Sequence, residues 1–314
     1  MNVGTKVMIL GLGVGLFLSC NESQTSKQGP DAETPTTGGG SPPLLVYTVN
    51  YPLQYFAERI GGDLVEAVLP APQGTDPAYW RPTPEQIVAY QNADLILLNG
   101  AGFAKWLTLA SLPLSKQVDT SASFKDRYIE LEEGPVHSHG PEGEHSHKGF
   151  AFTTWLDPTL AIEQARAILE ALSTERPEHR ELLESRFRSL EADLQALDVE
   201  LADVASALQG RFVLFSHPVY QYLVRRYDLD AASVHFEPGQ LPTIQQWKQL
   251  DELLARKPSQ WMVWEDEPLP EIATMLKERN VGIAVFQPCA NVPTEGDYLR
   301  VMQDNVRHLR RLVS

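Results

Sequence analysis

Hydrophobic positions alternate between strand-like and helix-like spacing along most of the chain. Short β-rich apolar runs predict strands at residues 44–49, 64–69, 94–98, 211–215, 233–236, 261–264 and 283–286. Between them, apolar residues three and four apart predict helices at 51–60, from Thr83 onward, and at 218–227, 244–255, 269–279 and 298–313. Strands that alternate with helices favour parallel βαβ units, so the expected fold class is α/β.

A pair of longer helices is predicted between the two groups of strands. Asp157 and Pro158 begin the first, Pro177 interrupts it, and the second runs to Gly210. The second helix, about 31 residues and roughly 47 Å long, carries one apolar stripe made of Leu183, Phe187, Leu190, Leu194, Leu197, Leu201, Val204 and Leu208. One continuous stripe favours lengthwise packing on the chain's own core over a coiled coil. Such a helix could brace two lobes.

The N-terminus has the pattern of an export signal. Residues 7–18 are uncharged and mostly apolar, a stretch too short to cross a bilayer but suited to a signal-peptide core. Ser19 followed by Cys20 resembles a bacterial lipobox, which predicts a lipoprotein signal peptide over 1–19 and a lipid anchor at Cys20. A plain secretory signal cleaved elsewhere is the alternative. Residues 20–43 are polar and rich in Gly, Pro, Ser and Thr, which predicts a disordered tether.

Composition excludes several classes of function. The 314 residues include 26 Lys and Arg against 41 Asp and Glu, a net charge of −15 that argues against a nucleic-acid partner. Two cysteines cannot form a disulfide framework. The sequence contains no Gly-x-Ser-x-Gly, no His-Glu-x-x-His and no glycine loop that would cradle a phosphate after a strand, so we do not expect an enzyme.

One segment concentrates potential metal ligands. Residues 132–148, which we name the His-rich loop, contain His137, His139, His145 and His147, half of the chain's 8 histidines, with Glu142 and Glu144 beside them. Imidazole and carboxylate both bind divalent metals, and clustering them raises their local concentration. Glycine and proline leave the loop without a preformed site, so we expect weak, reversible zinc binding. A merely hydrophilic loop is the alternative.

A series of short motifs resembles a known family. The motifs, in chain order, are Gly61-Gly62-Asp63, Gly74-Thr75-Asp76-Pro77, Trp155-Leu156-Asp157-Pro158, Ser216-His217-Pro218 and Asp297-Tyr298-Leu299. Their order and spacing resemble the zinc- and manganese-type solute-binding proteins of bacterial metal ABC transporters. The resemblance implies two similar α/β lobes, parallel sheets flanked by helices, at 44–156 and 211–314. It also implies that the linking helices, 157–210, form a rigid backbone, with the ligand cleft between the lobes.

The same resemblance implies a function. The chain would capture a metal in the cleft, zinc or else manganese or another divalent cation, and deliver it to an ABC permease in the membrane. We expect a monomer that is exported and lipid-anchored on the periplasmic or cell-surface side of the bacterial membrane. The alternatives are a non-transport accessory of the same fold, acting as a metal buffer or adhesin, and a binder of a metal chelate or an anionic ligand.

The family's ligand positions are largely replaced. The motif D-P-H-x-Y-E-P has Ala78 in place of its histidine, and Thr153 stands where a second histidine is expected. Gln287 occupies the position of a ligating aspartate, and only His217 remains. Because one imidazole cannot hold zinc tightly, other residues must complete the site or the cleft binds something other than a bare metal.

Candidate replacements lie near the same motifs. Cys289 and Glu265 are the first choices, and Asp266, Glu267 and His235 are further ones. Each also has an ordinary structural explanation: a small buried side chain for Cys289, a solvated acidic loop for 265–267, and a strand histidine for His235.

Arg81 beside Trp80 supports the alternative of a chelate or anionic ligand. An arginine paired with a nearby carboxylate is the structural explanation for the same residue.

Overall fold

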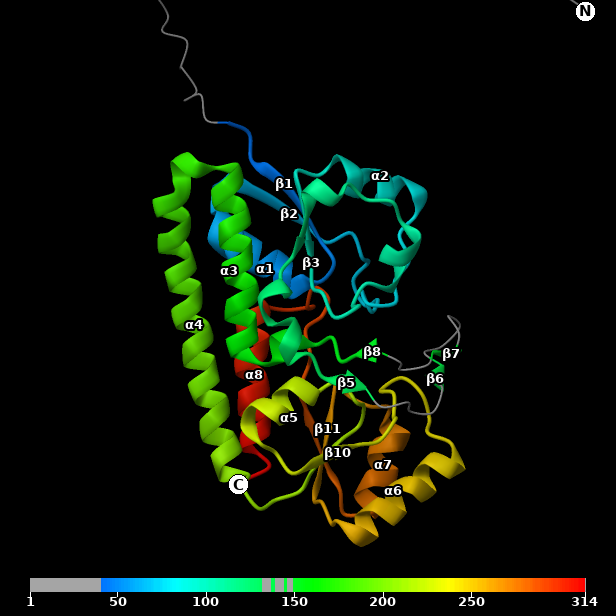
Figure 1. The fold of residues 1–314 in the computed structure, drawn as a ribbon. Helices are drawn as coiled ribbons and strands as arrows, with labels where there is room; N and C mark the ends of the chain where they lie inside the picture. Colours follow the sequence, from blue (N-terminus) through cyan, green and yellow to red (C-terminus); the bar gives the residue numbers. More distant parts are fainter. Residues whose placement is uncertain (1–40, 132–136, 139–143, 146–148, 314) are drawn as a thin grey trace, which may run out of the picture. The chain divides into compact units, whose positions relative to one another are not determined.

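Two four-stranded parallel sheets form the framework of the fold (Figure 1). This computed structural model describes residues 41–131, 137–138, 144–145 and 149–313. The first sheet has the order β2-β1-β3-β4, with β1 at Leu44–Thr48, β2 at Val65–Val68, β3 at Leu95–Leu98 and β4 at Gln117–Asp119. The second has the order β10-β9-β11-β12, with β9 at Val213–Phe215, β10 at Ala231–Ser233, β11 at Trp261–Trp264 and β12 at Gly282–Val285. The shared order confirms two similar α/β lobes.

The helices fall close to the predicted positions. They are α1 at Tyr51–Gly61, α2 at Pro84–Asn92, α3 at Pro158–Glu175, α4 at Arg180–Ala207, α5 at Gln221–Tyr227, α6 at Ile244–Arg256, α7 at Pro270–Glu278 and α8 at Tyr298–Arg310. Both α2 and α6 begin with a capping box in which a threonine and a glutamine three residues later bond each other's backbone N–H, Thr83 with Gln86 and Thr243 with Gln246. The two lobes therefore start equivalent helices by the same local chemistry.

Several elements differ from the sequence prediction. The strand predicted at 233–236 is β10, which begins two residues earlier and ends three residues earlier. The helix predicted from residue 218 begins at Gln221, because residues 218–219 form a turn after β9. Strand β4 was not predicted, since Val118 is its one apolar residue and an edge strand needs no buried run.

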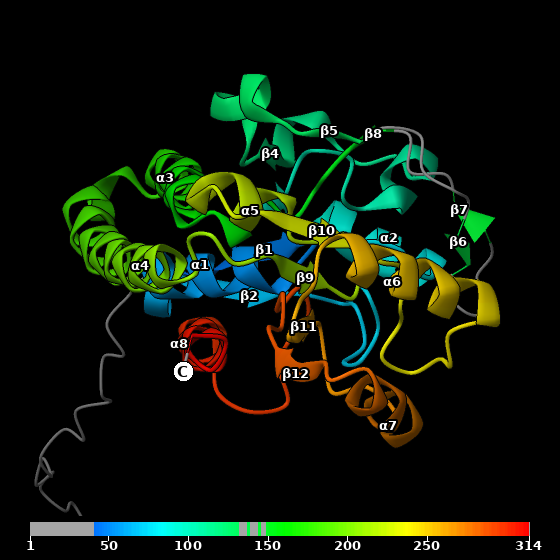
Figure 2. The same cartoon turned by 90° about the horizontal axis from the view of Figure 1, so that it is seen from below.

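Helix α4 connects the packing of the two lobes. Helix α4 contacts α1 and α3, which precede it in the sequence, and α5 and α8, which follow it. It lies alongside α3 in both views (Figure 1, Figure 2). The predicted apolar stripe is buried along its whole length. Its residues belong to one core cluster that also contains Val46 of β1 and Val213 of β9. Residues 42–314 form one compact unit, and the proposed lobe boundaries at 156 and 210 stay a prediction.

One short antiparallel strand pair flanks the His-rich loop, and a second lies within it. β5 at Glu130–Leu131 pairs with β8 at Gly149–Phe150, and β6 at His137–Ser138 pairs with β7 at Glu144–His145. The predicted signal peptide, Cys20, most of the tether, His139 and His147 lie outside the described residues. Within the described part of the chain, no helix has the length and apolar character needed to span a membrane.

The buried stripe of α4 generates a stability prediction. Leu194→Ala removes a fully buried side chain and should lower the free energy of unfolding by about 2–5 kcal/mol, through lost burial and the cavity left behind. Val199→Ala, at a 60% exposed position of the same helix, should change it by no more than about 0.5 kcal/mol. Urea denaturation of both variants measures the difference, and equal midpoints would contradict the bracing role of the stripe.

Candidate metal centre

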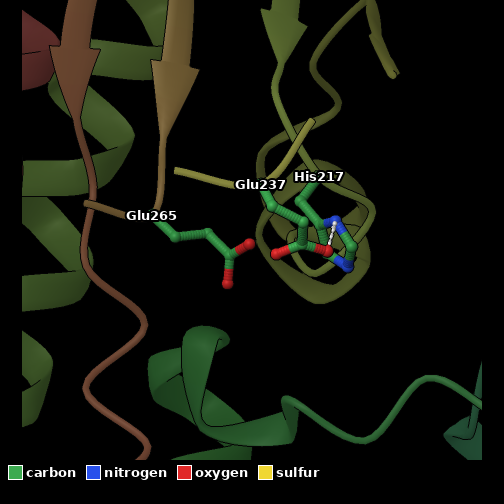
Figure 3. A group of neighbouring side chains, drawn as sticks. All are labelled: His217, Glu237 and Glu265. Carbon is green, nitrogen blue, oxygen red and sulfur yellow. Dashed lines mark ion pairs between the residues drawn. The ribbon is translucent and has the colours of Figure 1, made fainter. Parts of the chain in front are cut away.

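Three potential metal ligands converge at one edge of the second sheet (Figure 3). His217 lies two residues after β9, Glu237 four residues after β10 and Glu265 directly after β11. One ligand atom from each side chain lies within 4.8 Å of the other two. Because adjacent parallel strands end at the same sheet edge, residues far apart in sequence meet there, where open α/β sheets bind ligands.

Backbone hydrogen bonds fix the segments that carry these side chains. The N–H of Ser216 donates to the Val263 carbonyl (2.8 Å), and the N–H of Phe236 donates to the Ser216 carbonyl (2.7 Å). The three segments are thereby aligned just beyond the ends of their strands. A tight turn follows, in which the N–H of Val219 donates to the His217 carbonyl (3.0 Å). The sequence therefore places the imidazole on a rigid support rather than on a free loop.

His217 is buried and close to a carboxylate. Its side chain is 6% exposed, and its Nδ1 lies 3.3 Å from Oε1 of Glu237, whose side chain is 25% exposed. The ring of His235 stands edge-on to that of His217, with centroids 6.0 Å apart. His217 and Glu237 line two neighbouring pockets: a main cavity, and a smaller pocket that is also lined by His235. The group is thus shielded from bulk solvent but reachable.

A cavity of about 330 Å³ opens in front of this group. Its described lining carries the carboxylates of Asp76, Glu237 and Glu265 and contains no lysine or arginine. Aromatic residues form much of the remaining wall: Tyr79, Phe103, Phe152 and Trp155. Carboxylates next to an apolar wall attract a cation more strongly than they would in water, because the local dielectric constant is lower. The lining favours a cationic ligand.

Residues of both lobes contribute to this cavity. Burial raises the pKa of Tyr79 to about 12, and the charges of Asp76 and Glu237 add to the shift. The Tyr79 phenol therefore lies within electrostatic reach of Asp76 from the first lobe and Glu237 from the second. Tyr79 stays protonated at neutral pH. The side-chain amide of Asn291 donates to the carbonyls of Pro72 and Thr75 (2.7 Å each), which holds the Asp76 turn against the second lobe.

The three replaced family positions contribute no ligand to the group. Thr153 lines the cavity, but its hydroxyl donates to the Val219 carbonyl at 2.5 Å. Ala78 is fully buried, lies outside the cavity lining and has no ligating side chain. Gln287 also lies outside the lining, and its backbone N–H and carbonyl are both bonded by the Asn305 side chain (2.9 and 2.8 Å).

The proposed replacements divide between the cavity and the surface. Glu265 joins His217 in the group, whereas Asp266 and Glu267 are exposed and outside the lining. His235 lies behind His217 rather than in the main cavity. Arg81 is exposed and lies outside the cavity lining. It therefore cannot contact a ligand in the cavity, and the argument for an anionic ligand that rested on Arg81 no longer holds.

Cys289 lines the cavity but differs electronically from the three ligands. It is 8% exposed, and burial raises its pKa to about 12, with a further contribution from the charge of Asp297. Its thiol therefore stays protonated at neutral pH, and it is not a member of the group within 4.8 Å. This agrees with the structural explanation of a small buried side chain.

Sequence reasoning missed Glu237. The signal was present, because Glu237 directly follows the strand predicted at 233–236, just as Glu265 directly follows the strand predicted at 261–264. Both positions lie at the carboxyl edge of a parallel sheet.

In the His-rich loop, the backbone register sets His137 opposite His145 across β6 and β7.

Comparison with known proteins identifies the family. The model of the family described as "Zinc-uptake complex component A periplasmic" matches residues 46–312. The chain is 26% identical over 280 residues to the zinc-binding lipoprotein AdcA of Streptococcus pneumoniae serotype 4, covering 85% of this chain and 55% of that protein. It is 27% identical over 255 residues to the high-affinity zinc uptake system protein ZnuA of Bacillus subtilis, covering 79% and 72%. The chain thus spans about half the length of the AdcA relative.

Solved structures share the fold. The metal-dependent lipoprotein YcdH from Bacillus subtilis gives a TM-score of 0.73 at 21% identity, covering 86% of this chain and 100% of that one. The Zn(II)-bound ZnuA-like domain of Streptococcus pneumoniae AdcA gives 0.71 at 20% identity, covering 86% and 99%. These likenesses establish the architecture of two α/β lobes joined by a long helix.

The raised pKa of Cys289 predicts how its thiol reacts. In a Cys20→Ser chain, where Cys289 is the one remaining thiol, alkylation by iodoacetamide should be slow at pH 8 and accelerate as the pH rises toward about 12. The raised pKa favours the folded state below pH 9, and this contribution is lost between about pH 9 and about 12. Fast alkylation at pH 8 under native conditions would contradict the burial argument.

Proposed function

Because the chain belongs to the family of the periplasmic zinc-uptake complex component A, we propose that it is the solute-binding component of an ABC transporter for zinc. It captures the cation in the cavity and delivers it to a membrane permease. One observation carries this proposal: His217, Glu237 and Glu265 face one another at the edge of a cavity whose described lining holds no lysine or arginine. The role is binding and delivery rather than catalysis.

The donor set suits a cargo that must be released. One imidazole nitrogen and two carboxylates are accepted zinc ligands, and three protein ligands leave a coordination position open, unlike the closed four-ligand structural sites. The ligands come from separate segments, so the cation contacts three strand ends at once. The oxygen-rich set also suits manganese, and we propose zinc as the physiological cargo because the relatives are named as zinc-binding and zinc-uptake proteins.

The site of action follows from the N-terminal sequence. We propose export and lipid anchoring at Cys20, on the periplasmic or cell-surface side, in line with relatives named as lipoproteins. The polar tether up to residue 43 would let a monomer reach its permease while staying at the membrane. The His-rich loop would hold zinc weakly and raise its local concentration.

Substitution of the cavity histidine tests the proposal. His217→Ala should weaken zinc binding at the tight site by at least about a hundredfold, because loss of a direct ligand should cost no less than loss of an outer-shell partner. Glu265→Gln should weaken it by at least about tenfold. His179→Ala, at a half-exposed histidine on the turn before α4, should bind as the unmodified chain does. Isothermal titration calorimetry of the full chain measures the constants.

A second comparison separates the cavity from the loop. Replacing His137, His139, His145 and His147 together by alanine should lower the zinc stoichiometry and leave the tight site intact. The proposal fails if the four-histidine variant loses all tight binding while His217→Ala keeps it. Competition by manganese in the same titration reports the selectivity of the cavity.

A further inference from the structure

The group of three ligands is drawn from one lobe only. His217, Glu237 and Glu265 all follow strands of the second sheet. A tetrahedral cation held by these three still has a coordination position to fill. In the first lobe, the two positions where the family would supply an imidazole hold Ala78, which is buried and outside the cavity lining, and Thr153, whose hydroxyl donates to the Val219 carbonyl. The first lobe must therefore contribute through another residue or not at all.

Among the described lining residues of the first lobe, Asp76 is the one that carries a carboxylate. The described lining residues of this lobe are otherwise apolar or neutral, with Thr75, Tyr79 and Thr153 as the polar ones. Asp76 lies only two residues from the lost ligand position, in the same turn. Its Oδ1 accepts a hydrogen bond from the N–H of Ala78 at 2.9 Å, which orients the carboxylate.

The turn that carries Asp76 is held in place by the opposite lobe. Asn291, in the segment after β12, donates to the carbonyl of Thr75 directly before Asp76 and to that of Pro72 (2.7 Å each). Both Asn291 and Asp76 line the cavity. Tyr79, one turn further on, lies within electrostatic reach of both Asp76 and Glu237. The carboxylates of the two lobes therefore face the same volume.

We propose that Asp76 is the metal ligand of the first lobe, replacing the imidazole missing at position 78. The inference rests on the proposed function, since it concerns the same cavity. Asp76 is not one of the three side chains whose ligand atoms lie within 4.8 Å of each other, so its carboxylate moves toward the cation when the cation binds. A divalent cation in the cavity attracts the carboxylates of Asp76, Glu237 and Glu265 together, because an opposite charge favours their charged forms. Cation binding thereby links the two lobes.

A matched pair of substitutions tests the role of Asp76. Asp76→Asn removes the charge and keeps an oxygen that accepts from the Ala78 N–H. The control is Asp266→Asn: Asp266 is exposed, adjacent to Glu265 and outside the lining, and its Oδ1 likewise accepts from a neighbouring N–H, that of Glu267 (2.8 Å). Both variants lose one negative charge close to the cavity. Only the first loses the proposed ligand.

The measurement is the zinc dissociation constant of the full chain in the background that lacks the four loop histidines. Asp76→Asn should weaken zinc binding by at least about tenfold, and Asp266→Asn by less than about twofold. Equal effects of the two variants would overturn the role of Asp76. If His217→Ala still abolishes tight binding in that case, the proposed function stands without it. If His217→Ala binds zinc as the unmodified chain does, the proposed function itself fails.

A structural readout covers the case in which Asp76→Asn fails to fold. In crystals of the zinc-loaded full chain, an Asp76 carboxylate oxygen should lie about 2.0–2.2 Å from the metal. A metal bound by His217 with Asp76 more than about 4 Å away would overturn the inference.

Asn291 serves as a positioning residue for Asp76 and has a distinct signature. Asn291→Ala should weaken zinc binding in the otherwise unmodified chain, because the Asp76 turn loses two hydrogen bonds. The same substitution should change zinc binding little when Asp76 is already asparagine. Additive effects of the two substitutions would mean that Asn291 acts on the fold rather than through Asp76.

Discussion

The buried stripe of α4 is the constraint on which the remaining structure depends. Helix α4 contacts α1 of the first lobe, its fellow linking helix α3, and α5 and α8 of the second lobe (Figure 1). The apolar side chains of its stripe belong to one continuous core. Burial of such a stripe is favourable only while both lobes stay packed on it. The two parallel sheets are thus held in a fixed relation, and residues from both lobes line a single cavity.

The chemistry of the cavity follows from the topology of the second sheet. Three neighbouring parallel strands end at one edge, and each is followed within four residues by His217, Glu237 or Glu265. The family's expected donors at 78, 153 and 287 are absent, yet the cavity still gathers nitrogen and carboxylate donors and, among its described residues, no lysine or arginine. The fold thus brings together potential cation ligands other than those that the family motifs predict.

The sequence predicted the fold more completely than the site. Periodicity and capping residues predicted the long helix and the strands of both parallel sheets except β4, whose sequence Gln-Val-Asp has no buried run to reveal it. The two-residue strands β5, β6, β7 and β8 were not predicted either. His217 and Glu265 were predicted, while Glu237 was missed because it belongs to none of the family motifs and its position at a strand end is its only signal in the sequence. Arg81, next to Trp80, was expected as a possible cleft residue, but it is exposed and lies outside the cavity lining. Spacing along the chain predicts which strand a residue follows, whereas the direction of a loop side chain depends on packing with distant segments.

Zinc held in the cavity by His217, Glu237 and Glu265 would join the fold to the proposed function. Anomalous diffraction at the zinc edge, from crystals of the zinc-loaded full chain, detects zinc at this position. We expect an anomalous peak in the cavity, about 2.0–2.2 Å from a nitrogen of His217 and from oxygens of both glutamates. Zinc found only at the His-rich loop, with no peak among these three side chains, would contradict it.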